Sequence, residues 1–220
     1  MNAAASILIL FTATLQTDID KAEKHLSDGM AKFTAGDVQG SLEDFDKTAE
    51  LAPALIPRLW QRGISQYYAG LYQEGREQFE IHKTVNPNDV ENATWHYLCV
   101  AKLEGVDAAR KALIPIDTKK DSRVPLKEVY ELYAGQGSVE QVLQRAKQFN
   151  RPMTYMYANL YIGLYYEAAG DVDQAKKYMQ AAAAAIDLRE HYMQRVAKVH
   201  LQQRGWQPAR KAKKADTKGK

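Results

Sequence analysis

The sequence predicts an all-α protein organised as a solenoid of helix–turn–helix repeats. Apolar residues recur every three or four positions along most of the chain, which is the period of a helix face and not of a strand. Two stretches also carry the same residue types in the same order. They are Gly29, Gly36, Phe45 and Pro53, followed 34 residues later by Gly63, Gly70, Phe79 and Pro87. This period is typical of repeated helix pairs, so we expect about eleven helices and no sheet.

The chemistry of each repeated residue suits such a helix pair. Gly29 and Gly63 are expected to let a neighbouring helix approach closely, and Gly36 and Gly70 to end the first helix in the left-handed conformation. The phenylalanine fills the space between helices, and the proline ends the second helix. With these residues the chain resembles the tetratricopeptide repeat (TPR) family. The resemblance implies a right-handed superhelix whose first helices line the inner curve.

The first two repeats are expected at about residues 22–55 and 56–89 of a TPR domain that covers residues 18–208. Helical spacing from Ala22 to Phe33 and from Leu42 to Leu51 predicts the two helices of repeat one. Repeat two follows the same plan, with its second helix continuing to Val85. Gly75 stands where the family prefers alanine, which weakens that helix by up to about 1 kcal/mol.

The second half is less regular. Residues 90–150 are predicted as a degenerate repeat, with Trp95, Leu98, Cys99 and Leu103 on one helix face, followed by short helices at 124–134 and 138–149. Ser138 is the expected N-cap of the latter. A regular repeat returns at 156–189, and 188–204 is predicted as the amphipathic capping helix that a solenoid end requires. Residues 209–220 form a basic segment without apolar pattern, expected to be disordered.

Composition limits the possible classes of protein. The 220 residues are 45% hydrophobic with a formal net charge of +3, and a mean hydropathy of −0.49 argues against a polytopic membrane protein. From Arg204 onward the chain carries seven Lys or Arg and one Asp, so the remaining chain is mildly acidic. The single cysteine, Cys99, excludes an internal disulfide framework and is expected to be a buried, inert thiol.

Residues 3–15 are uncharged and mostly apolar. Thirteen residues are too few to cross about 30 Å of hydrocarbon, so no transmembrane span is predicted. The length suits the apolar region of a signal peptide within residues 1–17, although no Lys or Arg precedes it and no Ala-x-Ala site follows it. Export to the periplasm or the extracellular space is one interpretation. The alternative is an ordinary N-terminal helix of a cytoplasmic protein.

No signature of an enzyme is present. The sequence lacks a Walker loop, a Gly-x-Ser-x-Gly elbow and a His-Glu-x-x-His motif. The five histidines are scattered over different predicted helices, where a helix surface or a solvated interface is the expected environment; they are His25, His82, His96, His191 and His200. We therefore predict a non-enzymatic protein with no metal, no cofactor and no specific nucleic-acid partner.

The predicted binding surface is a groove lined by first helices. Its residues are Leu26, Met30 and Phe33 in repeat one, Trp60, Ile64 and Tyr67 in repeat two, and Tyr157, Leu160 and Leu164 in the last repeat. TPR domains that clamp a C-terminal carboxylate have Lys and Asn at positions matched here by apolar residues. The resemblance therefore argues against such a clamp. It favours an apolar groove, exposed as a strip for a partner, or a groove filled by another helix of the same protein.

The layout of regular repeats around an irregular middle containing Trp95-His96-Tyr97-Leu98 is also similar to that of the NlpI-type TPR proteins of the bacterial cell envelope. This second resemblance implies a dimeric adaptor that brings peptidoglycan hydrolases to proteases or to one another. The chain has no cysteine for the lipid anchor of that family. The expected function is thus a scaffold for a protein or peptide partner, with a homodimer as one possibility. The alternative is a cytosolic interaction module whose basic tail contacts RNA or anionic lipid.

Overall fold

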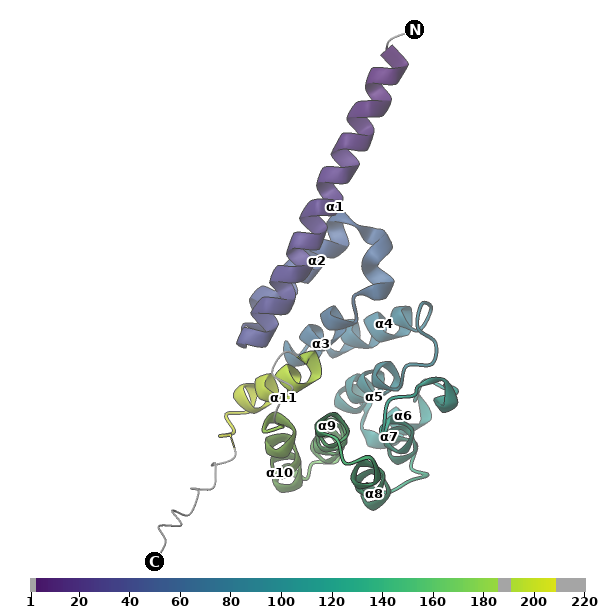
Figure 1. The fold of residues 1–220 in the computed structure, drawn as a ribbon, viewed down its shortest axis with the longest axis vertical. Coiled ribbons are helices and arrows are strands. Elements are labelled where there is room, and N and C mark those ends of the chain that lie inside the picture. The colour runs from purple at the N-terminus through teal and green to yellow at the C-terminus, as the bar shows by residue number, and fades with distance from the viewer. Residues whose placement is uncertain (1–2, 186–190, 209–220) are drawn as a thin grey trace, which may run out of the picture.

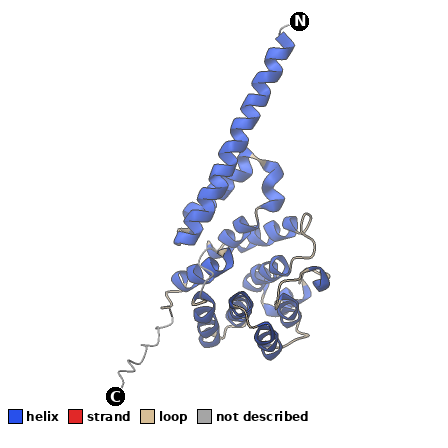
Figure 2. Cartoon of the chain, in the orientation of Figure 1, coloured by secondary structure: helices blue, strands red, loops and turns tan. Residues whose placement is uncertain are grey.

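Every regular element in the described part of the chain is a helix (Figure 2). The computed structural model describes residues 3–185 and 191–208, with side chains from residue 17 onward. The elements are α1 (Ala3–Ala35), α2 (Val38–Leu51), the 3₁₀ helix η1 (Pro53–Arg58), α3 (Trp60–Tyr68), α4 (Tyr72–His82), α5 (Val90–Glu104), α6 (Val106–Lys111), the 3₁₀ helix η2 (Thr118–Lys120), α7 (Leu126–Tyr133), α8 (Val139–Phe149), α9 (Pro152–Ala168), α10 (Val172–Ala183) and α11 (Tyr192–Gln203). The all-α prediction is confirmed for these residues. The predicted disordered tail, 209–220, lies outside them.

The repeated glycine and phenylalanine meet inside each of the first two helix pairs. A Cβ atom on Gly29 would lie 3.0 Å from the ring of Phe45, and one on Gly63 would lie 2.7 Å from the ring of Phe79. Such approaches leave no room for a side chain, so only glycine allows α1 to pack on α2 and α3 on α4 at this separation. The pair α9–α10 uses Gly163 in the same way. We call these three pairs the regular hairpins.

The turns of the regular hairpins also follow the sequence pattern. Gly36, Gly70 and Gly170 have φ angles of 92°, 81° and 82°, values that favour glycine because a Cβ would be strained there. The prolines match the prediction in the first repeat only. Helix α2 ends at Leu51, just before Pro53, which begins the 3₁₀ helix η1. Helix α4 ends at His82, well before Pro87, so Val85 lies outside the helix and is exposed.

The middle of the chain, α5 to α8, departs from the repeat. The long α5 is followed by the six-residue α6, a loop, and the pair α7–α8. Trp95, Leu98 and Cys99 are buried as predicted, whereas Leu103 is exposed near the end of α5. The predicted cap is confirmed, because Ser138 accepts from Gln141 N and the Gln141 side chain accepts from Ser138 N.

The helix α11 returns to the start of the array, so it is more than a terminal cap. In Figure 1 it lies beside α3 and the end of α1, although it is separated from them by more than 120 residues of chain. It also contacts α9 and α10. The helix begins at Tyr192, and the predicted start at 188 lies outside the described residues.

The helix α1 runs without a break through residue 17, the expected end of the apolar segment. Its C-terminal half packs on α2, and its N-terminal half extends beyond the rest of the molecule (Figure 1). Among the described residues, no helix has the combination of length and apolar character needed to cross a membrane.

Candidate functional site

Most of the predicted groove residues are buried in the protein itself. Phe33, Ile64, Tyr67, Tyr157, Leu160 and Leu164 are each at most 5% exposed, while Leu26, Met30 and Trp60 are partly exposed. The expectation of an exposed strip is therefore wrong for these six buried residues, which are Phe33, Ile64, Tyr67, Tyr157, Leu160 and Leu164. The physical reason is that the array curves back on itself, so the first helices pack against each other and against α11.

Helix α11 fills the groove next to the first two repeats. The Tyr192 ring stacks on Phe33 of α1 with centroids 5.7 Å apart, and it meets Trp60 of α3 edge-on at 5.2 Å. Farther along α11, His200 Nδ1 lies 3.0 Å from the Tyr68 hydroxyl. This arrangement corresponds to the second possibility derived from the sequence, a groove occupied by another helix of the same chain.

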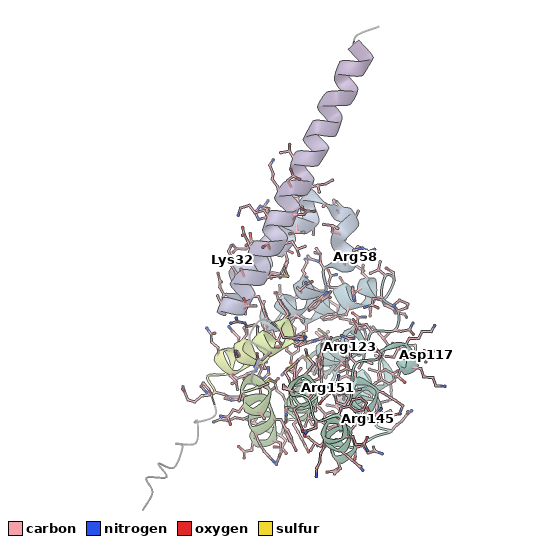
Figure 3. All side chains as sticks on the ribbon, in the orientation of Figure 1. Lys32, Arg58, Asp117, Arg123, Arg145 and Arg151 are labelled. Carbon is pink, nitrogen blue, oxygen red and sulfur yellow. The ribbon has the colours of Figure 1, made fainter. Side chains whose placement is uncertain are left out.

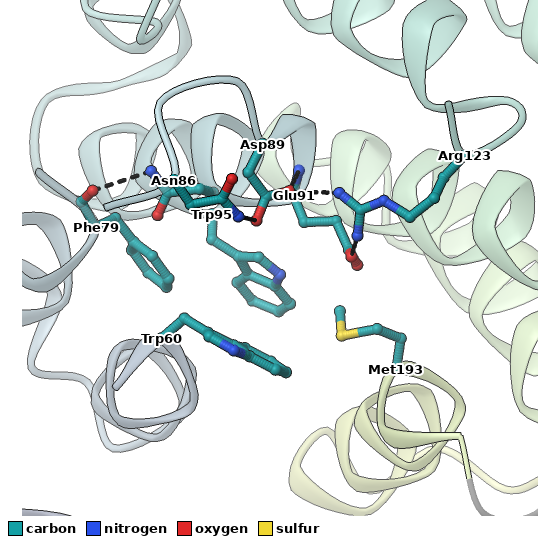
Figure 4. Close-up of a pocket in the computed structure, with 9 residues that line it drawn as sticks. Trp60, Phe79, Asn86, Asp89, Glu91, Trp95, Arg123 and Met193 are labelled. Atoms are coloured by element: carbon teal, nitrogen blue, oxygen red, sulfur yellow. Dashed lines mark hydrogen bonds and ion pairs between the residues drawn. The ribbon is translucent and has the colours of Figure 1, made fainter. Parts of the chain in front are cut away.

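A smaller opening remains beside Trp60. It is a cavity of about 230 Å³ that combines aromatic walls with charged and amide groups (Figure 4). Its lining residues are Trp60, Phe79, Asn86, Asp89, Glu91, Asn92, Trp95, Arg123 and Met193. They come from α3, α4, the α4–α5 turn, α5, the loop before α7, and α11. We refer to this cavity as the aromatic–acidic pocket.

At the edge of this pocket the guanidinium of Arg123 forms ion pairs with three carboxylates. Arg123 Nη2 lies 2.5 Å from Asp89 Oδ1 and 2.6 Å from Asp121 Oδ2, and Arg123 Nη1 donates to Glu91. Figure 3 labels Arg123 near the middle of the view, and its side chain is 38% exposed, whereas its three carboxylate partners are at most 14% exposed. The acids outnumber the base, so the cluster has an excess of negative charge when all of its groups are ionised.

Local backbone contacts explain why these acids gather here. Asp89 is the N-cap of α5 and accepts from Glu91 N at 3.0 Å. Asp121 accepts from Val90 N at 3.2 Å and from Arg123 N at 3.2 Å, which ties the loop before α7 to the start of α5. Carboxylates at a helix N-terminus are favoured by its unpaired N–H groups and by the helix dipole.

The two pocket carboxylates have opposite pKa shifts. Burial raises the pKa of Glu91 to about 7, against the opposing attraction of Arg123. Burial also acts on Asp89, but hydrogen bonds and attraction from His82 and Arg123 hold the pKa of Asp89 below its usual value. Tyr161 donates to Glu91 Oε1 at 2.6 Å, an interaction available to either protonation state of the carboxyl group. Near neutral pH the pocket therefore retains at least the Asp89 charge.

Two buried polar atoms that line the pocket have no hydrogen-bond partner. Trp95 is 1% exposed, and its Nε1 donor is unused. In Figure 4 this nitrogen faces the space between Glu91 and Met193. Asn92 donates from Nδ2 to Phe79 O at 3.0 Å, but its Oδ1 acceptor is unused. Unpaired buried polar atoms cost free energy. Both atoms are closed to solvent, so neither meets a bound group unless its side chain turns toward the cavity.

A second ionic cluster joins α11 to α9. Glu167 Oε1 of α9 lies 2.6 Å from Arg204 Nε and 3.6 Å from Lys102 Nζ. His200 of α11 approaches the same carboxylate, and burial lowers its pKa to about 4. One carboxylate here faces two permanent cations. The cations outnumber the acid here, which suits a structural contact, although Glu167 Oε2 and His200 Nε2 have no hydrogen-bond partner.

The sequence did not identify the acidic side of the pocket. Asp89, Glu91 and Arg123 carry no motif, and Arg123 lies in a loop more than thirty residues from Asp89 and Glu91. The one available signal was Asp89 at a helix start. The prediction of solvated histidines is wrong for His82, His96 and His200, which are buried because each lies on an interior helix face.

Among the described residues, two kinds of chemical group would indicate reactivity: a metal-binding cluster and a reactive thiol. In the described part of the chain no group of three or more His, Cys, Asp or Glu is placed to hold a metal ion. The Cys99 thiol is buried, and burial raises its pKa, which disfavours the nucleophilic thiolate. No known protein-family model matches the sequence.

Proposed function

We propose that this protein is a non-enzymatic helical-repeat adaptor of the TPR type that binds a protein or peptide partner. The repeated helix pairs support this proposal, because the 34-residue period, the paired glycine and aromatic residue, and the left-handed turn glycine recur together. Stacked helix pairs present extended surfaces and are used widely as binding scaffolds. The observation that carries the proposal is the aromatic–acidic pocket, which opens where the predicted groove is not filled by α11.

The binding surface that we propose is smaller than the predicted groove. It comprises the aromatic–acidic pocket and the partly exposed side chains of Leu26, Met30 and Trp60. Trp60 belongs to both sets. Partly exposed tryptophan beside a cavity is typical of the residues that dominate binding energy at protein interfaces.

We further propose that the adaptor acts in the bacterial cell envelope, on the basis of the apolar segment at residues 3–15 and the layout shared with NlpI-type proteins. The cytosolic alternative relies on the basic segment, which lies outside the described residues. The N-terminal sequence of the protein isolated from its native host separates the two proposals. Export with cleavage predicts a mature start between Ala13 and Asp18, and a start at Met1 contradicts it.

The adaptor proposal is tested by recovering partners from the native host by affinity purification and measuring each affinity by calorimetric titration. Trp60→Ala should weaken binding by more than tenfold, about 1.4 kcal/mol. Phe149→Ala is the matched control, because Phe149 is an exposed aromatic residue on α8. Deleting residues 209–220 should change the affinity by less than about threefold at 0.15 M salt, where exposed charges are largely screened. Loss of binding on tail deletion alone would place the function in the basic segment.

A further inference from the structure

We propose that the aromatic–acidic pocket binds one arginine side chain of the partner protein, with the guanidinium between the tryptophan rings and the carboxylates. This inference rests on the proposed adaptor function and adds the chemistry of the recognised residue. It is supported by the charge of the pocket, the character of its walls, its two unpaired polar atoms and its size.

The charge of the pocket favours a cation. Asp89, Glu91 and Asp121 share the single guanidinium of Arg123, so a second positive group compensates charge that the chain leaves unbalanced. Asp89 and Glu91 line the cavity itself. The Glu167 cluster provides the contrast within the same molecule, because there two permanent cations face one carboxylate.

The apolar walls favour arginine over lysine. Trp60, Phe79 and Trp95 line one side of the cavity (Figure 4). Tryptophan is the strongest aromatic partner for a cation. A guanidinium is planar, stacks on aromatic faces and is less strongly hydrated than an ammonium group. An arginine side chain therefore loses less hydration on entering this pocket and gains more contact with its walls.

The two unpaired buried atoms match the groups of an arginine residue. Asn92 Oδ1 and Trp95 Nε1 are closed to solvent and unpaired. When the two side chains turn toward the cavity, the Asn92 acceptor meets a guanidinium N–H and the Trp95 donor meets a main-chain carbonyl of the bound peptide. A peptide residue with a cationic side chain supplies both, whereas an isolated metal ion or ammonium ion leaves the indole N–H unpaired.

The size of the pocket limits the ligand. Its volume of about 230 Å³ is below the roughly 300–1,000 Å³ of typical small-molecule sites. One long side chain fits this space better than a nucleotide or other organic cofactor does. The Met193 side chain on α11 forms the wall opposite Glu91 and Arg123 (Figure 4), so the returning helix is part of the site.

The test is an NMR titration of the full chain at pH 8, where the Glu91 carboxyl, with its pKa of about 7, is mostly ionised. The probes are the capped tripeptides Gly-Arg-Gly, Gly-Lys-Gly and Gly-citrulline-Gly, of which citrulline is the neutral analogue of arginine. The indole N–H signals of the three tryptophans are assigned with Trp60→Phe and Trp206→Phe. The arginine peptide should shift the Trp95 signal with a dissociation constant on the order of 1 mM. We expect at least tenfold weaker binding of the citrulline peptide, with the lysine peptide between the two.

Two variants complete the test. Glu91→Gln keeps the shape of the side chain and should weaken arginine binding by about fivefold, whereas Glu43→Gln, an exposed matched control on α2, should leave it unchanged. Equal binding of the arginine and citrulline peptides, or no shift of the Trp95 signal, would overturn the arginine site. That result leaves the adaptor function to its own test, because a partner that depends on Trp60 without an arginine in the pocket still supports an adaptor.

Discussion

In the regular hairpins, a glycine of the first helix lies against a large side chain of the second, whereas in the middle of the chain a loop is held to α5 by a guanidinium shared among three carboxylates. The hairpin contacts are apolar, and each joins two helices that follow each other in sequence. In the middle, the ion pairs of Arg123 with Asp89 and Glu91 cross more than thirty residues. Helix packing therefore builds the scaffold, and the interruption of the repeat creates the pocket.

The largest expected effect tests the apolar packing within the regular hairpins. Phe79→Ala should lower the free energy of unfolding by about 3–5 kcal/mol, because it empties a fully buried position between α3 and α4. Phe45→Ala should cost less, since a hairpin near the end of an array has fewer neighbours. Denaturant unfolding of both variants measures the difference. A wild-type midpoint for Phe79→Ala would contradict the packing role that we assign to this residue.

The second prediction concerns the middle of the chain. Arg123→Met should lower the free energy of unfolding by about 2–3 kcal/mol, because it leaves three carboxylates without their cation. The side chain is 38% exposed, which places the loss below that of a fully buried ion pair. Arg76→Met is the matched control. Arg76 is 30% exposed, but its partners Glu80 and Glu104 are about half exposed, whereas those of Arg123 are at most 14% exposed. Water can therefore solvate the carboxylates that Arg76 leaves, so its loss should cost less than about 1 kcal/mol.

If Arg123→Met and Arg76→Met lowered stability equally, the Arg123 cluster would contribute no more than an ordinary surface ion pair. A stable Arg123→Met protein would also show that the loop before α7 does not depend on this guanidinium. Thermal unfolding at pH 7.5, with all four proteins at one concentration, decides between these outcomes. The four proteins are wild type, Arg123→Met, Arg76→Met and Phe79→Ala. The last shows how large the loss of stability is when a buried core side chain is removed.

The difference between local hairpin contacts and distant ionic contacts also explains which parts of the structure the sequence could predict. Gly63 and Phe79 interact across sixteen residues within one repeat, so periodicity reveals their contact. The turn glycines and the Ser138 cap are likewise local signals. Arg123 reaches Asp89 and Glu91 only when α5 and the following loop have folded. No sequence spacing predicts this contact. The fold of the hairpins was therefore predictable, whereas the acidic side of the pocket was not.

The predicted groove illustrates the limit in another way. Apolar residues such as Phe33 and Ile64 were placed correctly on first helices, but the pattern is the same for a face that binds a partner and for one that binds α11. The path of α11 depends on the curvature of the whole array, which accumulates over all the hairpins. Helical periodicity identifies an apolar face and leaves its occupant open.

A smaller effect should appear in the pH dependence of stability. Burial raises the pKa of Glu91 from 4.5 to about 7 in the folded protein. The folded state therefore binds this proton more tightly than the unfolded chain, and the stability it contributes is full below about pH 4.5 and is lost as the pH rises through 7. Relative to wild type, Glu91→Gln should gain about 1–2 kcal/mol in stability between pH 5 and pH 8.

The charged and titratable groups that face Glu91 are Arg123, Asp89, Asp121 and Tyr161, and all remain in this variant. Unfolding free energies measured every half pH unit give the two curves. Parallel curves for wild type and Glu91→Gln would show that Glu91 is ionised throughout this range, and that Arg123 outweighs burial. The middle of the chain would then be a balanced ionic contact, more similar to the Glu167 cluster.

The smallest expected effect lies where a regular hairpin meets the middle of the chain. Gly75 is inside α4, and alanine is favoured over glycine in a helix interior by about 1 kcal/mol. A Cβ atom on Gly75 would, however, lie 3.0 Å from Cys99 Sγ of α5, closer than an unstrained contact. We expect the two effects to offset, so that Gly75→Ala changes the free energy of unfolding by less than about 0.5 kcal/mol.

In a Cys99→Ala background the sulfur is absent, and Gly75→Ala should stabilise the protein by about 1 kcal/mol. A double-mutant cycle with the four proteins isolates this coupling. Additive effects would mean that α4 and α5 can separate without cost, and that the boundary between the hairpin and the middle is looser than the packing of Gly63 on Phe79.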